Sequence, residues 1–388
     1  MPLIQVADTR KALGQLANHV RRGFTRTKVL AIAGSNGKTT TKNLLHSVLS
    51  TELKGTASPK SFNNDIGVPA TLLPVSADDD YVIVEIGTNH PGEVDALSRM
   101  AEPDCAVIVS IGEEHLEFFK NLDGVRRENA QITAGLRDGG PLIVTGDDPA
   151  LRDHLPKDRA ITTFGFDEGN ALRATDVQVT AEGTSFVAAT PASPLPREGD
   201  AGVAATKIPL IGAHFAACGL AVVAVARWMG LSDADIQRGF DRAAPSDMRM
   251  QPKQIGSITL LNDAFNANPT SMRAALKTAQ QIAPPRRLVL VLGQMGELGE
   301  TSIAAHADIF AEARQIPALL IAVGDAFQPH AEASDRWFPD STTAAAEIPT
   351  LLRPGDVVLL KGSRSTRLEK IAAAVEQAFQ KQEANPSS

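Results

Sequence analysis

A short apolar run that ends in a glycine-rich turn constrains this chain more than any other feature. Residues 28–33 (KVLAIA) lead into residues 34–37 (GSNG), and a helix-like segment begins at Lys38. An apolar run of this length, bounded by glycine, is typical of a buried strand. Glycine adopts backbone conformations that other residues rarely reach, so the chain can pass sharply from strand to helix. The segment therefore predicts the first strand and helix of a parallel α/β sheet.

The same alternation continues through the first half of the chain. Apolar runs at residues 81–86, 105–109 and 141–144 are separated by helical segments. This order predicts a mainly parallel sheet with helices on both faces. From residue 167 to 209 the pieces become shorter and rich in threonine, valine and alanine, and residues 191–202 are rich in proline and glycine. That change predicts a small antiparallel addition with an exposed loop.

A second alternating block follows. Apolar runs at residues 258–263, 288–293, 318–324 and 356–363 are separated by helical segments, and another helical segment closes the chain. With 388 residues, the chain is also longer than one hydrophobic core usually requires. We therefore predict two α/β domains, residues 1–244 and a smaller, Rossmann-like domain at residues 245–388.

Composition and charge exclude several classes of protein. The chain has 43% hydrophobic and 21% charged residues, as soluble globular proteins do. Its net charge is -7 and no Lys/Arg block is present, so we expect no nucleic-acid partner. The most apolar stretch, residues 215–229, is interrupted by Arg227 and is shorter than the about 20 residues that span a bilayer, so we expect no membrane insertion. The N-terminus lacks a secretory signal, and Cys105 and Cys218 lie far apart, which together favour the cytoplasm.

The glycine-rich turn is a compact phosphate-binding loop. Its backbone N–H groups can converge on phosphate oxygens, and the positive end of the next helix strengthens that field. We expect Lys38 to contact the β- and γ-phosphates and the Thr39 hydroxyl to ligate Mg²⁺. The loop predicts binding of ATP or GTP but leaves the reaction open, because hydrolases, kinases and ligases share it. The residues assigned to the nucleotide are Gly34, Ser35, Asn36, Gly37, Lys38, Thr39 and Thr40.

Six further segments narrow the interpretation. They are residues 62–69 (FNNDIGVP), 85–93 (EIGTNHPGE), 111–117 (IGEEHLE), 261–269 (LNDAFNANP), 292–300 (LGQMGELGE) and 361–364 (KGSR). Together with the phosphate loop, and in this order, they resemble the motifs of the Mur ligase family along nearly the whole chain. The resemblance implies a P-loop ATPase domain with a mainly parallel sheet, followed by a smaller C-terminal α/β domain that closes over ATP.

The resemblance also implies roles for single residues. Lys38, His115 and Arg249 are the candidate catalytic residues, with Arg249 reaching the γ-phosphate from the other domain. Thr39, Glu85 and His115 are the candidate Mg²⁺ ligands. Asp263 is expected to hold the ribose of ATP and Asn266 its adenine side. The candidate substrate contacts are Asn63, Asn64, Asn89, His90, Asn268, Lys361 and Arg364.

The function implied is an ATP-dependent ligase that forms an amide bond. Transfer of the γ-phosphoryl group turns a carboxylate into an acyl phosphate, which an amine can attack, and no protein nucleophile is needed. Small-molecule substrates, such as a small carboxylate and an amino acid, are our first expectation. One alternative is a peptidoglycan-precursor ligase that needs a partner chain to bind a UDP-muramoyl peptide. The other is a nucleotide-binding module that has lost turnover.

Three departures from the family pattern motivate these alternatives. The first strand already begins at Lys28, which leaves no room before it for the UDP-binding domain of muramoyl ligases. Asn129 stands where the resemblance implies a carbamylated lysine that ligates a second Mg²⁺. Either Glu128 or Glu114 substitutes for it, or the second cation is held more loosely, or the chain has lost activity. The segment around His214 is reduced, and Cys218 replaces an asparagine that often helps to hold adenine.

Overall fold

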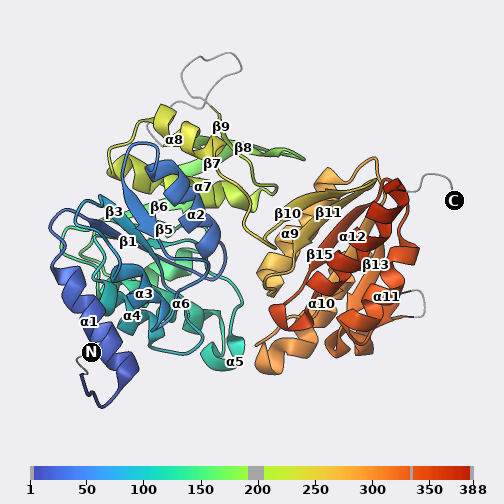
Figure 1. Cartoon of the computed structure of the whole chain (residues 1–388), viewed down its shortest axis with the longest axis horizontal. Helices are drawn as coiled ribbons and strands as arrows, with labels where there is room; N and C mark the ends of the chain where they lie inside the picture. The colour runs from blue at the N-terminus through green and yellow to red at the C-terminus, as the bar shows by residue number, and fades with distance from the viewer. Residues whose placement is uncertain (1–3, 191–204, 333–334, 385–388) are drawn as a thin grey trace.

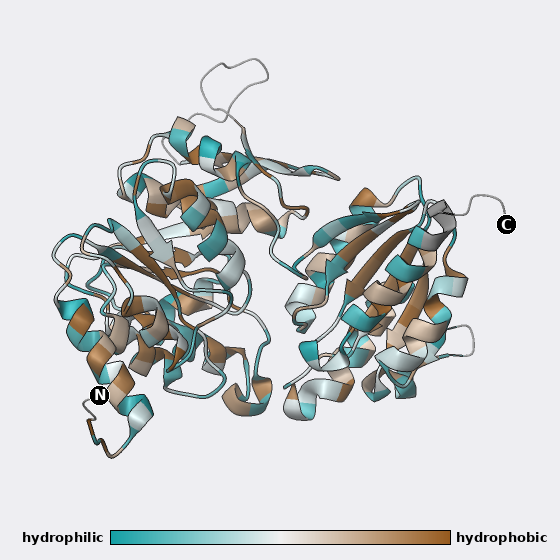
Figure 2. Ribbon diagram, viewed as in Figure 1, coloured by the Kyte–Doolittle hydropathy of each residue, from teal (hydrophilic) through white to brown (hydrophobic). Residues whose placement is uncertain are grey.

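A computed structural model describes residues 4–190, 205–332 and 335–384, and these fold into two lobes, each built on one sheet (Figure 1). The proline- and glycine-rich loop expected at residues 191–202 lies outside the described residues. The central strands of both sheets are apolar, and the polar residues lie mainly on the strands toward the sheet edges, the outer helices and the loops (Figure 2). The expected α/β architecture is confirmed.

The first sheet is parallel over most of its width. Within the described residues its order is β2-β3-β1-β4-β5-β6-β7-β8-β9, and the pairing is parallel from β2 to β7 and antiparallel from β7 to β9. The antiparallel addition was therefore predicted correctly. The strands are β1 (Lys28–Ala33), β2 (Gly55–Ala57), β3 (Tyr81–Glu85), β4 (Cys105–Ile108), β5 (Leu142–Thr145), β6 (Ile161–Gly165), β7 (Leu172–Thr180), β8 (Gly183–Ala189) and β9 (Thr206–Ile208).

Helices cover both faces of this sheet. Alternate residues of a strand point to opposite faces. In β1, Leu30 and Ile32 belong to a core cluster that includes residues of α2, α7 and α8, whereas Val29, Ala31 and Ala33 belong to one that includes residues of α1, α3 and α4. The helices of this lobe are α1 (Thr9–Arg22), α2 (Lys38–Leu49), α3 (Gly67–Leu72), α4 (Glu93–Ala101), α5 (Leu116–Phe119), α6 (Leu122–Ala130), α7 (His214–Trp228) and α8 (Asp233–Asp241).

The apolar segment near residue 215 is the buried helix α7. It packs on the face of the sheet formed by the strands β5 to β8 and contacts α2 alongside. In the part of the chain that the structure describes, no helix is long and apolar enough to cross a membrane.

The second sheet has the order β10-β11-β15-β12-β13-β14 within the described residues. All its pairs are parallel except the edge pair β10–β11. Helices α9 and α10 cover the face that continues the core of the first lobe, and α11 and α12 cover the other face. The elements are β10 (Gln251–Ile255), β11 (Ile258–Asp263), α9 (Pro269–Ile282), β12 (Leu288–Gly293), α10 (Ser302–Arg314), β13 (Ala318–Val323), β14 (Arg336–Phe338), α11 (Ser341–Leu351), β15 (Val357–Lys361) and α12 (Glu369–Ala384).

His306 anchors a loop of the second lobe from inside the core. It is fully buried on α10, its Nε2 accepts a hydrogen bond from the backbone N–H of Met295 (2.9 Å), and its Nδ1 donates to the Ser302 carbonyl (2.7 Å). Burial lowers the pKa of His306 below its usual value, which the Ser302 hydrogen bond only partly opposes. The imidazole is therefore neutral in the folded protein.

We predict that His306→Ala destabilises the protein by about 2–4 kcal/mol at pH 7, because it leaves a buried N–H without an acceptor and opens a cavity. The pKa of His306 is lowered by folding, so its contribution to stability is complete above the unfolded value near 6.5 and is lost as the pH falls below it. The gap in unfolding free energy between wild type and variant, measured by urea titration, should shrink from pH 7 to pH 5. His19→Ala, at an exposed position, is the control, and a pH-independent gap would contradict the prediction.

Candidate active site

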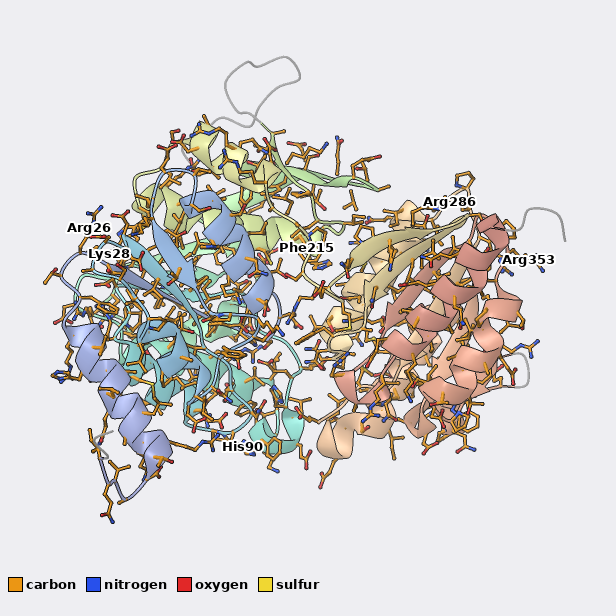
Figure 3. All side chains as sticks on the ribbon, in the orientation of Figure 1. Arg26, Lys28, His90, Phe215, Arg286 and Arg353 are labelled. Atoms are coloured by element: carbon orange, nitrogen blue, oxygen red, sulfur yellow. The ribbon has the colours of Figure 1, made fainter. Side chains whose placement is uncertain are left out.

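A cavity of about 850 Å³ lies between the two lobes. Parallel strands of one sheet all end at the same edge, where open α/β folds bind their ligands. Here β1, β3 and β4 of the first sheet and β11 and β15 of the second end beside the cavity. Phe215 and His90 line it from the first lobe, and both lie on the side turned to the second lobe (Figure 3).

The phosphate loop needs its glycines. Gly34 and Gly37 have φ angles of 127° and 83°, which side chains strongly disfavour. A Cβ atom on Gly34 would lie 2.9 Å from the backbone nitrogen of Ser110, and one on Gly37 would lie 2.9 Å from the Cys218 Sγ. The turn delivers the chain to the start of α2, with Lys38 and Thr39 in its first turn.

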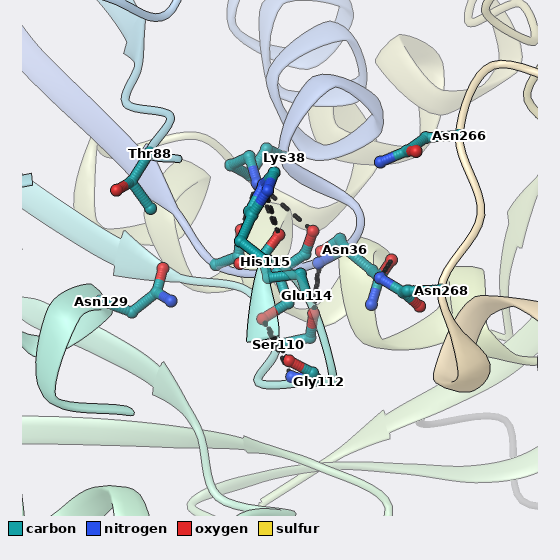
Figure 4. Close-up of polar contacts among 12 residues, drawn as sticks. Asn36, Lys38, Thr88, Ser110, Gly112, Glu114, His115, Asn129, Asn266 and Asn268 are labelled. Carbon is teal, nitrogen blue, oxygen red and sulfur yellow. Dashed lines mark hydrogen bonds and ion pairs between the residues drawn. The ribbon is translucent and has the colours of Figure 1, made fainter. Parts of the chain in front are cut away.

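Two serines fix the phosphate loop to the segment after β4. Ser35 Oγ donates to the Gly112 carbonyl (3.2 Å) and accepts from its N–H (2.9 Å). Ser110 Oγ does the same with the Asn36 backbone, with both distances at 2.9 Å (Figure 4). The loop and the segment that leads to His115 therefore form one unit. Sequence analysis did not single out Ser110, since a serine after a strand carries no particular signal.

The Lys38 side chain folds back over the phosphate loop. Its ammonium donates to the carbonyls of Gly34 and Ser35, the latter at 3.3 Å. The Glu114 carboxylate lies 3.8 Å from it, too far for a hydrogen bond. The charge is thus placed where phosphate oxygens would meet the N–H groups of the loop.

Thr39 and Glu85 lie together, as expected for ligands of one cation. The Thr39 hydroxyl donates to Glu85 Oε2 (2.9 Å), and the Asn63 amide donates to Oε1 (3.0 Å). Sequence analysis missed Lys42, whose fully buried ammonium lies 3.6 Å from Glu85 and donates to the Ser58 carbonyl (2.7 Å). Burial lowers the pKa of Lys42, and the charge of Glu85 opposes that shift. Lys42 therefore balances the charge of Glu85 and fixes its position.

Arg249 brings a cation from the second lobe to the phosphate loop. Its guanidinium donates to the hydroxyls of Thr39 (3.1 Å) and Ser61 (3.4 Å) and lies 4.0 Å from the centre of the Phe265 ring. Burial lowers the pKa of Arg249, whereas Glu85 and Asp263 raise it. An arginine remains charged even so.

The residues expected around the nucleoside meet on the other side of the cavity. Asp263 forms an ion pair with the buried Lys361 (3.0 Å), and Lys361 also donates to the Asn266 carbonyl (2.6 Å). His214 completes this wall. Desolvation lowers the pKa of His214 to about 4, although Asp263 raises it. His214 is therefore neutral above pH 5 and can both donate and accept a hydrogen bond.

The expected substrate contacts divide into two groups. Asn63, Asn64, Asn89, His90 and Lys361 line the cavity. Asn268 does not line it, but caps α9 by accepting from the Ser271 N–H (2.8 Å) and links the lobes through a bond to Asn36 Oδ1 (3.0 Å). Arg364 also lies outside the lining and pairs with Glu369 (3.1 Å) on the surface.

Comparisons with known proteins identify the family. Residues 32–226 match the Mur ligase middle domain, and residues 248–364 match the Mur ligase, glutamate ligase domain. The chain belongs to the Mur ligase family. The expectation of an ATP-dependent ligase that forms an amide bond, releasing ADP, is thereby confirmed.

Individual relatives are similar along almost the whole chain. The UDP-N-acetylmuramoyl-tripeptide--D-alanyl-D-alanine ligase of Bacillus subtilis is 32% identical, over 95% of this chain and 80% of its own length. The enzyme of the same name from Escherichia coli is 32% identical, over 97% and 83%. The crystal structure of MurF from Acinetobacter baumannii has a TM-score of 0.86 and 31% identity, covering 97% of this chain and 84% of that one. MurF from Thermotoga maritima in complex with ADP, at 23% identity, shares the fold with a TM-score of 0.86.

We predict that Arg249→Lys lowers kcat for ADP release by about 100-fold, because lysine keeps the charge but loses the planar fork that reaches Thr39 and Ser61. The dissociation constant for ATP should change much less, since the lysine still opposes the phosphate charge. Steady-state kinetics and isothermal titration calorimetry separate the two quantities. Arg286→Lys on the surface is the control; equal effects of both substitutions would contradict a role for Arg249 at the phosphates.

Proposed function

We propose that this chain joins D-alanyl-D-alanine to a UDP-N-acetylmuramoyl tripeptide and hydrolyses ATP to ADP and phosphate in doing so. The observation that carries the proposal is the convergence of Lys38, the Thr39–Glu85 pair and Arg249 from both lobes on one cavity. The named activity of the Bacillus subtilis and Escherichia coli relatives supports this substrate pair over our first expectation of other small substrates. ATP is the proposed nucleotide because ADP is bound in a structure of the same fold.

The proposed reaction has two steps. An oxygen of the substrate carboxylate attacks the γ-phosphorus, the bond from phosphorus to the bridging oxygen breaks, and ADP leaves. The amine of the dipeptide then attacks the acyl carbon, phosphate leaves, and the amine loses a proton. Lys38 and Arg249 stabilise negative charge on the transferring phosphoryl group, and positioning by the cavity supplies most of the remaining acceleration.

Thr39 and Glu85 fit a Mg²⁺ site, because hydroxyl and carboxylate oxygens are the ligands that this ion prefers. The buried Lys42 keeps the Glu85 carboxylate in place beside the hydroxyl. Bound Mg²⁺ would neutralise charge on the phosphate oxygens. His115 stands at the start of α5 with its side chain 14% exposed, and we assign it to a second Mg²⁺.

We assign the remaining residues to parts of the substrates by the side of the cavity on which they lie. We propose that Asp263 holds the ribose and that Asn266 holds the adenine side, with neutral His214 beside them. Asn63, Asn64, Asn89 and His90 face the muramoyl peptide from the opposite wall. Asn268 positions α9 against the phosphate loop.

Three wider features belong to the proposal. We divide the chain into an ATPase domain at residues 1–244 and a C-terminal domain at residues 245–388, which is supported by the separation of the two matched segments. A partner chain is proposed to bind the UDP end of the substrate. The cytoplasm is the proposed location, because Cys105 and Cys218 are buried free thiols.

We predict that Lys38→Ala lowers substrate-dependent ADP release by at least about 100-fold, because the ammonium that stabilises the transferring phosphoryl group is lost. Mass spectrometry of the product with UDP-muramoyl tripeptide, D-alanyl-D-alanine and Mg·ATP, with and without cell extract, measures the reaction. Lys54→Ala, on the surface, should react like wild type. Full activity of the Lys38 variant would reject the mechanism, and a wild type that couples only other amines and carboxylates would reject the substrate pair.

A further inference from the structure

We infer that Glu114 ligates a second divalent cation of the active site. The inference rests on the proposed function, because it needs ATP in the cavity. It assigns the carboxylate of one residue to one cation.

The Glu114 carboxylate is buried and lacks a partner for one oxygen. The residue is 6% exposed and lines the cavity. Its Oε1 has no hydrogen-bond partner, and its Oε2 lies 3.8 Å from the Lys38 ammonium and 3.9 Å from His115 Nε2. Buried carboxylate oxygens are nearly always hydrogen-bonded or bound to a metal, because an unpaired one is costly. The free oxygen therefore points to a ligand.

The negative charge of ATP indicates that the ligand of the free Glu114 oxygen is a cation. Lys38 and His115 approach Glu114, but neither is within hydrogen-bond distance (Figure 4). An ionised carboxylate beside the triphosphate of ATP would repel it. A divalent cation between the carboxylate and the phosphate oxygens removes the repulsion and occupies Oε1. His115, next in sequence, offers a nitrogen to the same ion.

The other candidates are less suited than Glu114. Asn129 is buried, its amide nitrogen donates back to the Val125 carbonyl of its own helix (3.0 Å), and its neutral amide oxygen is a weaker ligand for Mg²⁺ than a carboxylate. The Glu128 carboxylate accepts from the N–H groups of Gly92 (2.7 Å) and Val94 (2.9 Å) at the start of α4. Of the two acidic residues that sequence offered in place of the lysine, only Glu114 is free to take a cation.

The cation should bind only with nucleotide. Among the described residues, no group of three or more His, Cys, Asp and Glu side chains is placed to hold a metal by itself. Mg²⁺ commonly binds through one or two carboxylates and completes its shell with phosphate oxygens and water. Glu114 and His115 supply that protein share, and the triphosphate supplies the rest.

The experiment counts bound Mn²⁺, a spectroscopic substitute for Mg²⁺, by electron paramagnetic resonance in the presence of a methylene-bridged ATP analogue. Wild type should bind two Mn²⁺ ions per chain with the analogue. Glu114→Gln, which keeps the shape of the side chain, should bind one ion tightly and the second at least about tenfold more weakly. Glu113→Gln is the matched control, since Glu113 lies next in sequence with its carboxylate half exposed and 3.6 Å from Arg273, and it should bind two ions.

Two results would overturn the inference. One is a wild type that binds a single Mn²⁺ at saturating analogue. The other is an unchanged second ion in Glu114→Gln, which would leave Glu114 as a counter-ion of Lys38 only. Retention of the first Mn²⁺ and of the analogue shows that the variant is folded. Wild-type product formation is measured in parallel, so two ions with the expected loss but no ligated product would reject the proposed function and leave the inference standing.

Discussion

The parallel pairing of β1 with both β3 and β4 is the constraint on which the rest of the structure depends. It brings the phosphate loop, Glu85 and Ser110 to one edge of the sheet, although these residues are far apart in sequence. The Ser35 and Ser110 hydroxyls bond backbone atoms of the opposite loop, and these bonds hold the phosphate loop in place. Pre-positioned donors stabilise a transferring phosphoryl group without a further cost of reorganisation.

The charged groups of the site are held in position both by burial and by ion pairing. Lys42 and Glu85 are both almost completely buried, and each needs the other, because a buried charge without a partner is strongly destabilising. Lys42 also binds the backbone at Ser58, so one ammonium connects α2 to the segment that precedes Asn63. A change at Lys42 would therefore disturb the carboxylate and the asparagine segment together.

Sequence predicted the parallel strands well, because strands buried on both faces are continuous apolar runs. It missed β10, whose sequence QPKQI is polar because it lies at an edge, β6, whose first three residues are not fully buried, and β2 and β14, which have three residues each. Motifs placed most of the site in the cavity. They could not show that Asn268 caps a helix and that Arg364 faces away, because both facts depend on how the second lobe packs. Lys42, on α2, went unnoticed because its partner Glu85 is distant in sequence, at the end of β3.

At the contact between the lobes, one hydroxyl group bonds both a carboxylate of the first lobe and an arginine of the second. The Thr39 hydroxyl donates a hydrogen bond to Glu85 and accepts one from Arg249. A Mg²⁺ ion held by Thr39 and Glu85 would occupy the hydroxyl oxygen that accepts from Arg249, and the guanidinium would then be available to the γ-phosphate. The Phe265 ring, 4.0 Å from the guanidinium, belongs to the second lobe as Arg249 does, so this contact does not depend on the first lobe. One arginine would thus couple cation binding in the first lobe to the position of the second.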